Sequence, residues 1–131
     1  MKKLSKAHLE EWLAAFGQSW QNADPVAAVA LFDDDCAFYP SPFDLPFEGK
    51  DAIYAYWAQI PNIQTNIQFH YQVFETRSLS AVVYWQVYYT LVGTGEPMEL
   101  NGVMEVKFGT SGLCKQVREW WHARVLPPLA Y

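Results

Sequence analysis

Residues 98–108, MELNGVMEVKF, and residues 113–124, LCKQVREWWHAR, decide the fold of this chain. In the first stretch apolar side chains at the even positions alternate with mostly polar side chains at the odd positions. In the second, Val117, Glu119, Trp121 and Ala123 share one face. A period of two predicts strands with one face against a core, and the Gly112 turn between them predicts an antiparallel hairpin.

The same period extends backwards along the chain to residue 67. Residues 67–73 alternate Ile, Phe, Tyr and Val with polar side chains, and residues 81–92 place Val83, Trp85 and Val87 on one face. Glycines and a proline in residues 93–97 predict the turn into the next strand. The C-terminal half is therefore expected to form four strands joined mainly by tight turns.

The N-terminal half has the helical period instead. Apolar residues recur at helical spacing in residues 4–21, and Asp24 followed by Pro25 predicts the start of a second helix that reaches Phe32. A short strand is expected at residues 36–39, followed by an irregular apolar loop at residues 40–47, which holds three prolines. A third helix is expected from Lys50 to about Ile60.

This order of elements predicts an α+β fold. Three N-terminal helices pack on one face of a mostly antiparallel sheet, and strong curvature would make that sheet a cone with the helices on its concave side. The 131 residues are expected to form a single domain, 1–131, that buries about two thirds of the extended chain's surface.

Composition excludes several classes of function. Nine Lys and Arg against 14 Asp and Glu give a net charge of −5, which argues against nucleic-acid binding. No apolar run approaches the ~18 residues of a membrane span. Cys36 and Cys114 fit neither a CxxC pair nor a zinc pattern, so we expect a reduced, cytoplasmic protein with no metal and no cofactor. No signal peptide is expected after Met1.

Glu119 breaks the apolar pattern of the last strand. It lies between Val117 and Trp121 on the face predicted to be buried, where a carboxylate is costly unless it is paired or protonated. Burial would raise its pKa and suit it to proton transfer. The competing interpretation, which the sequence favours over proton transfer, is that Glu119 is a structural carboxyl that accepts hydrogen bonds from a Trp or Tyr. A register error of one residue would instead place Glu119 on the other face of the strand and remove the anomaly.

The opposite sheet face is predicted to be aromatic. Trp120 must point away from Trp121, its neighbour on the strand, and it shares its face with Tyr84, Tyr88 and His122. An exposed aromatic face of this kind predicts a homodimer interface.

Two stretches carry a resemblance to a known family. The segments QNADPVAAVALFDDDCAFYPSPFDLPFEGKDAIYAYWAQ and GLCKQVREWWH resemble the nuclear transport factor 2-like superfamily, in its SnoaL-like and ketosteroid-isomerase-like branch. The resemblance covers essentially the whole chain. It implies a curved sheet capped by three helices, a mostly apolar pocket and frequent homodimers. Members of this superfamily include isomerases, dehydratases, cyclases, epoxide hydrolases and non-catalytic binding domains.

Residue by residue, the resemblance argues against steroid isomerisation. Phe16 stands where ketosteroid isomerases carry the oxyanion tyrosine, Pro40 where they carry the base and Met104 where they carry the oxyanion aspartate. Two further pocket tyrosines fall on Phe32 and Trp57. Phe and Met donate no hydrogen bond and Pro accepts no proton, so that machinery is missing. Glu119 replaces a small apolar residue of the family.

Three functions remain open from the sequence. The first is binding of a small apolar or aromatic molecule in an aromatic pocket, the second a lyase, isomerase or cyclase with Glu119 as its single acid or base, and the third a protein-interaction module that uses the sheet face. Whether the chain is an enzyme stays open. The residues expected to contact the ligand are Trp12, Phe16, Trp20, Pro40, Phe43, Tyr56, Trp57, Phe69, Tyr71, Trp85, Val87, Tyr89, Met104, Val117 and Trp121.

Overall fold

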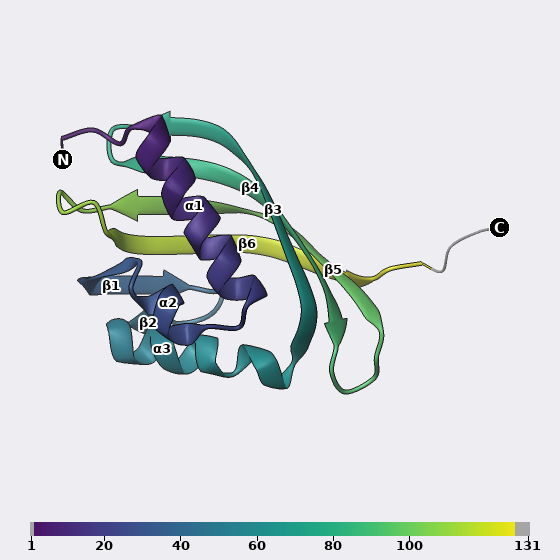
Figure 1. Ribbon diagram of the computed structural model, residues 1–131. Coiled ribbons are helices and arrows are strands. Elements are labelled where there is room, and N and C mark those ends of the chain that lie inside the picture. The colour runs from purple at the N-terminus through teal and green to yellow at the C-terminus, as the bar shows by residue number, and fades with distance from the viewer. Residues whose placement is uncertain (1, 128–131) are drawn as a thin grey trace.

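The computed structural model describes residues 2–127 and contains one curved sheet with helices on its inner side (Figure 1). In chain order the elements are α1 (Lys6–Gln21), α2 (Pro25–Val29), β1 (Phe32–Tyr39), β2 (Phe47–Glu48), α3 (Lys50–Ala58), the 3-10 helix η1 (Ile60–Asn62), β3 (Gln64–Arg77), β4 (Ser80–Leu91), β5 (Pro97–Phe108) and β6 (Cys114–Val125). The expected α+β class with three helices is confirmed.

The six strands form one unclosed sheet in the order β2-β1-β6-β5-β4-β3. Strands β3 to β6 pair with their sequence neighbours in antiparallel ladders, and β1 joins the edge of β6 in parallel. In Figure 1, α1 crosses the concave side of the sheet, and β3 and β5 bend away from it towards one end. The expected mostly antiparallel, curved sheet is confirmed.

Local sequence signals start the first two helices. The Ser5 side chain accepts a hydrogen bond from the His8 backbone N–H at 3.1 Å, which caps α1. Asp24 does the same for Ala27 at 3.0 Å, and Pro25 occupies the first turn of α2. The side of α1 that faces the sheet is apolar, and Trp12, Leu13 and Phe16 on it are buried.

Several predicted boundaries are wrong. The second helix ends at Val29, not at Phe32, and β1 begins at Phe32, so Asp33, Asp34 and Asp35 lie in a strand. The segment expected to be an irregular loop over 40–47 ends in strand β2, where Phe47 pairs with Phe38. Strand β3 extends at both ends beyond the predicted 67–73.

The strand register places two rows of side chains across the concave face. Val83, Met104 and Glu119 are consecutive partners on β4, β5 and β6, and Trp85, Gly102 and Trp121 form the next row. The first row is buried between sheet and helices. Within residues 2–127 no helix is long and apolar enough to cross a membrane.

Candidate functional site

A pocket of about 280 Å³ opens at one end of the interior, where the end of α1 and the α3–η1 segment meet strands β4, β5 and β6. Its wall is mainly apolar and aromatic, which is typical of small-molecule sites. The residues that line it are Trp20, Tyr56, Gln59, Ile60, Ile63, Gln64, Trp85, Tyr89, Leu100, Glu119, Trp121 and Ala123.

Glu119 lines this pocket, and one of its carboxyl oxygens, Oε2, is buried without a hydrogen-bond partner among residues 2–127. Its side chain is almost fully buried, with 4 % exposed, and no described residue hydrogen-bonds to Oε2. Burial raises the pKa of this carboxyl from its ordinary value of 4.5 to about 8. Glu119 is therefore mostly protonated at neutral pH and can donate or accept a proton near that pH.

Two arginines of the sheet pair with carboxylates other than Glu119. Arg77 pairs with Glu75 at 3.0 Å and Arg124 pairs with Glu99 at 2.8 Å. No Lys, Arg or His is among the described residues that line the pocket. The hydrogen bonds from a Trp or Tyr that would make Glu119 a structural carboxyl are also missing at Oε2 in the described part of the chain.

Tyr56 is the second titratable group of the pocket. Burial is the main cause that raises the pKa of its phenol, and the negative charges of Glu119 and Asp44 raise this pKa further. Tyr56 therefore lies within electrostatic reach of Glu119 and stays protonated over the ordinary pH range. Tyr89 also lines the pocket, and burial raises the pKa of its phenol.

Two tryptophans of the wall are held in place by hydrogen bonds. Trp20 Nε1 donates to Gln64 Oε1 at 2.8 Å, and Trp121 Nε1 donates to the Pro40 carbonyl oxygen at 2.6 Å. The Nε1 of Trp85 is buried and has no partner among residues 2–127. The pocket wall therefore contains two indoles held by hydrogen bonds, and two of its residues, Trp85 and Glu119, each have a buried polar atom without a partner in the described part of the chain.

The structure brings only part of the predicted ligand-binding set to this pocket. Five of the set line it, Trp20, Tyr56, Trp85, Tyr89 and Trp121, together with the candidate acid Glu119. Trp121 remains 39 % exposed at its edge, and Pro40 contributes the carbonyl that fixes this indole.

The other predicted residues lie elsewhere. Phe43 is 98 % exposed on the loop between β1 and β2, and Tyr71 lies with Phe69 in a separate shallow groove beside α1. The remaining six are packed in the core and do not line the pocket: Trp12, Phe16, Trp57, Val87, Met104 and Val117. The interior is thus largely filled, with open space at one end.

Sequence reasoning missed six lining residues, Gln59, Ile60, Ile63, Gln64, Leu100 and Ala123. Strand alternation already placed Leu100 and Ala123 on the inner face, so that signal was present. No signal pointed to Gln59, Ile63 or Gln64, because their position depends on the 3-10 turn after α3.

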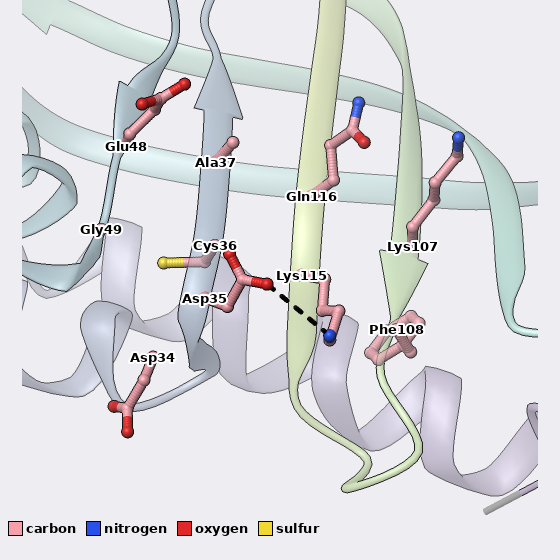
Figure 2. Close-up of a pocket in the computed structure, with 10 residues that line it drawn as sticks. All are labelled: Asp34, Asp35, Cys36, Ala37, Glu48, Gly49, Lys107, Phe108, Lys115 and Gln116. Atoms are coloured by element: carbon pink, nitrogen blue, oxygen red, sulfur yellow. Dashed lines mark ion pairs between the residues drawn. The ribbon is translucent and has the colours of Figure 1, made fainter.

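A larger groove of about 710 Å³ lies on another part of the surface (Figure 2). It runs over β1, β2, β5 and β6 and is lined by polar groups such as Asp34, Asp35 and Lys107. Asp35 and Lys115 form an ion pair at 3.9 Å across it, and Asp35 is almost wholly solvated. Solvated ion pairs of this kind contribute little free energy, and none of the described residues that line this groove has an unpartnered buried polar side-chain atom.

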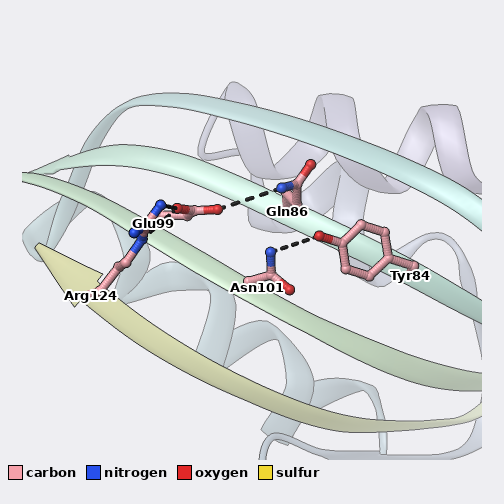
Figure 3. A network of polar contacts seen from close by, with 5 residues as sticks. All are labelled: Tyr84, Gln86, Glu99, Asn101 and Arg124. Atoms are coloured by element: carbon pink, nitrogen blue, oxygen red, sulfur yellow. Dashed lines mark hydrogen bonds and ion pairs between the residues drawn. The ribbon is translucent and has the colours of Figure 1, made fainter. Parts of the chain in front are cut away.

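The convex face of the sheet carries a polar network (Figure 3). Arg124 donates to Glu99 Oε1 at 2.8 Å, Gln86 approaches Glu99 Oε2 at 3.5 Å, and Asn101 donates to the Tyr84 hydroxyl at 2.7 Å. The hydrogen bond from Arg124 is the main cause that lowers the pKa of Glu99. Glu99 is therefore a paired carboxylate, in contrast to Glu119.

No group of three or more His, Cys, Asp or Glu side chains within residues 2–127 is arranged to hold a metal ion. Cys36 and Cys114 are buried and free, and burial raises the pKa of both thiols.

The sequence profile of the SnoaL-like domain family matches residues 9–117 of this chain. The chain therefore belongs to the SnoaL-like family, and the expected family is confirmed. A search of curated protein sequences finds no match.

Several solved structures share the fold of this chain at low sequence identity. The epoxide hydrolase/cyclase-like enzyme SalBIII, which acts in pyran ring formation in the polyether salinomycin, superposes with a TM-score of 0.80 at 16 % identity, covering 93 % of this chain and 98 % of that one. A putative isomerase from Bacillus subtilis superposes with a TM-score of 0.78 at 20 % identity, covering 88 % of this chain and 87 % of that one. A computationally designed 17-OHP binder superposes with a TM-score of 0.74 at 18 % identity, covering 89 % of this chain and 97 % of that one.

Proposed function

We propose that this SnoaL-like domain binds a small, largely apolar molecule in the pocket between α3, η1 and strands β4 to β6. The observation that carries the proposal is Glu119, a buried carboxyl with an unpartnered oxygen, which is one of the residues that line a largely aromatic pocket. An unpartnered buried polar group is costly, and a ligand that contacts it removes that cost. The similar structures support this reading, because they include an enzyme and a designed small-molecule binder.

A pocket-blocking variant tests the proposal. Ala123 is exposed at the pocket edge, so Ala123→Trp would place a large side chain in the opening without disturbing the core. We expect it to abolish the binding of indole and 2-naphthol, measured by isothermal titration calorimetry. Ala15→Trp, on the exposed side of α1, is the control and should bind as the wild type does. Equal binding by wild type and Ala123→Trp would contradict the assignment of this pocket.

A second candidate function is proton-transfer catalysis of the isomerase or cyclase type. It is favoured by a specific observation: the pKa of Glu119 at about 8 lies near neutrality, and the Tyr56 phenol lies within its electrostatic reach. The carboxylate would take a proton from a carbon atom beside a carbonyl and return it to the same or another carbon. Tyr56 would remain protonated and orient the carbonyl oxygen.

Deuterium exchange tests this second function without knowledge of the natural substrate. Small aryl ketones in deuterated buffer would exchange their α-protons, followed by NMR, faster with wild type than with Glu119→Gln. A positioned general base contributes about 10²–10⁴-fold, which sets the expected difference. Equal exchange rates for both proteins across the panel would leave binding as the function.

We also propose that two copies of the chain pair through the convex sheet face in the cytoplasm. Trp120 is 45 % exposed there, and Phe74 stacks on Tyr84 with ring centroids 5.6 Å apart. An exposed aromatic patch of this kind favours a subunit interface. Two free, buried cysteines support a reducing compartment.

A further inference from the structure

We propose that the pocket selects a small apolar molecule that carries a positively charged nitrogen, held beside Glu119 and against the surrounding aromatic rings. This inference rests on the proposed binding function and narrows the class of ligand.

The first argument is the missing counter-charge. Glu119 lies in the pocket with an unpartnered oxygen, and no basic side chain is among the described lining residues. Asp44, on the loop between β1 and β2, adds a second negative charge, because both acids act electrostatically on the Tyr56 hydroxyl. A buried carboxylate is stable only when a positive partner or a proton accompanies it, and a bound cation supplies the partner that the chain lacks.

The second argument is the chemistry of the wall. Five of the twelve lining residues are aromatic: Trp20, Tyr56, Trp85, Tyr89 and Trp121. Cations are attracted to the faces of aromatic rings, most strongly to Trp, and the attraction grows when water is excluded. The pocket therefore combines three indoles and two phenols with one carboxyl.

Other classes of ligand would make fewer favourable contacts with the pocket wall than an organic cation does. A hydrocarbon would pack on the rings and leave the Glu119 oxygen unpartnered. An anionic ligand would meet acidic groups and no described base. A neutral carbonyl compound would accept a hydrogen bond from protonated Glu119 but gain nothing from the negative ring faces. An organic cation contacts both the acid and the rings.

Proton linkage makes the inference measurable. Two other titratable groups, Tyr56 of α3 and Tyr89 of β4, line the pocket with Glu119, and the charge of Asp44 acts on the Tyr56 hydroxyl. Met104, the partner of Glu119 on β5, and Trp20 of α1 do not titrate. Because burial raises the pKa of Glu119 to about 8, a bound cation must displace its proton at pH 7. Cation binding should therefore release a proton and strengthen as the pH rises.

Three probes of similar size test this on the wild-type chain. Benzyltrimethylammonium carries a permanent positive charge, neopentylbenzene is its uncharged carbon isostere, and acetophenone represents neutral carbonyl compounds. We expect the dissociation constant of benzyltrimethylammonium to fall by about tenfold between pH 7 and pH 9, as the ionised fraction of a group with pKa about 8 rises. At pH 9 it should bind at least about tenfold more tightly than either neutral probe.

Two variants assign the effect to the pocket acid. Glu119→Gln keeps the shape of the side chain and removes its charge, so the preference for the cation and its pH dependence should both disappear. Glu105→Gln is the matched control: Glu105 lies on the convex face, where it pairs with Lys107, and its loss should change neither. At pH 7, calorimetry in phosphate and Tris buffers should show proton release on cation binding only for proteins that retain Glu119.

The outcomes separate this inference from the proposed function. Neutral probes that bind as tightly as the cation at pH 9, or more tightly, would overturn the inference and leave small-molecule binding intact. An unchanged cation preference in Glu119→Gln would also overturn it. Absence of binding by all three probes, together with identical behaviour of Ala123→Trp, would count against both.

Discussion

At the scale of single residues, Glu119 makes stability depend on pH in the direction opposite to most carboxyls. Burial raises its pKa from 4.5 to about 8, so the folded chain keeps a proton that the unfolded chain has lost. Stability therefore falls as the pH rises through that interval. We expect Glu119→Gln to remove this slope, so that the variant gains about 2–4 kcal/mol relative to wild type between pH 5 and pH 8.

Urea unfolding at several pH values measures this difference. The pKa of Glu99 is lowered, chiefly by its hydrogen bond to Arg124, so its contribution to stability is lost as the pH falls. That contribution is the same in both proteins and cancels from the comparison. Parallel stability curves for wild type and Glu119→Gln would show that Glu119 ionises normally and is not desolvated.

Sequence reasoning found Glu119 because alternation assigns each strand residue to a face. Alternation does not give depth, however, and Val117 and Met104 share the face of Glu119 yet are packed in the core. Whether a residue of that face meets a neighbour or open space depends on where the helices lie across the sheet. The buried position of Glu119 was therefore predictable, whereas the boundary between core and pocket was not.

At the scale of elements, Gly102 leaves room for the β6 backbone at Trp120 and Trp121 to lie close beside β5. A Cβ at Gly102 would overlap the Trp120 carbonyl oxygen and lie 2.7 Å from the Cβ of Trp121. We expect Gly102→Ala to cost about 1–3 kcal/mol of stability, because backbone rather than a flexible side chain must move. It should also weaken ligand binding, since Trp121 forms part of the pocket wall.

Thermal unfolding and calorimetry check both effects. Gly93→Ala is the control, because nothing lies within 4 Å of the position where its Cβ would be. It should unfold and bind as the wild type does. A Gly102→Ala chain with wild-type stability and affinity would mean that β6 accommodates the methyl group, and that Gly102 does not position Trp121.

The start of β1 shows why some element boundaries could not be predicted from the sequence. The second helix was predicted to reach Phe32, yet Phe32 is in a strand and pairs with Cys114 of β6, which lies far away in sequence. The acids are accommodated by neighbours from other elements: Asp33 accepts from Ser111 and Asp35 pairs with Lys115. Such non-local partners are invisible to patterns along the chain.

At the scale of the whole molecule, the two faces of the sheet carry acids in different states, and this difference bears on assembly. On the concave face Glu119 lacks a charged partner, whereas on the convex face Glu99 is neutralised by Arg124. In the proposed dimer, Trp120, Phe74 and Tyr84 would supply the apolar contacts of the convex face, and Glu99 would already have its counter-ion. A second copy of this face would meet it across a twofold axis.

We expect the wild-type chain to elute with twice its 15.1 kDa mass in size-exclusion chromatography with light scattering. Trp120→Arg should shift it to the monomer mass, because a new charge would be buried near its own copy in a symmetric interface. Leu45→Arg, at an exposed apolar residue of the β1–β2 loop, should leave the dimer intact. A dimer that survives Trp120→Arg but dissociates in Leu45→Arg would move the interface to that loop, and a monomeric wild type would remove it altogether.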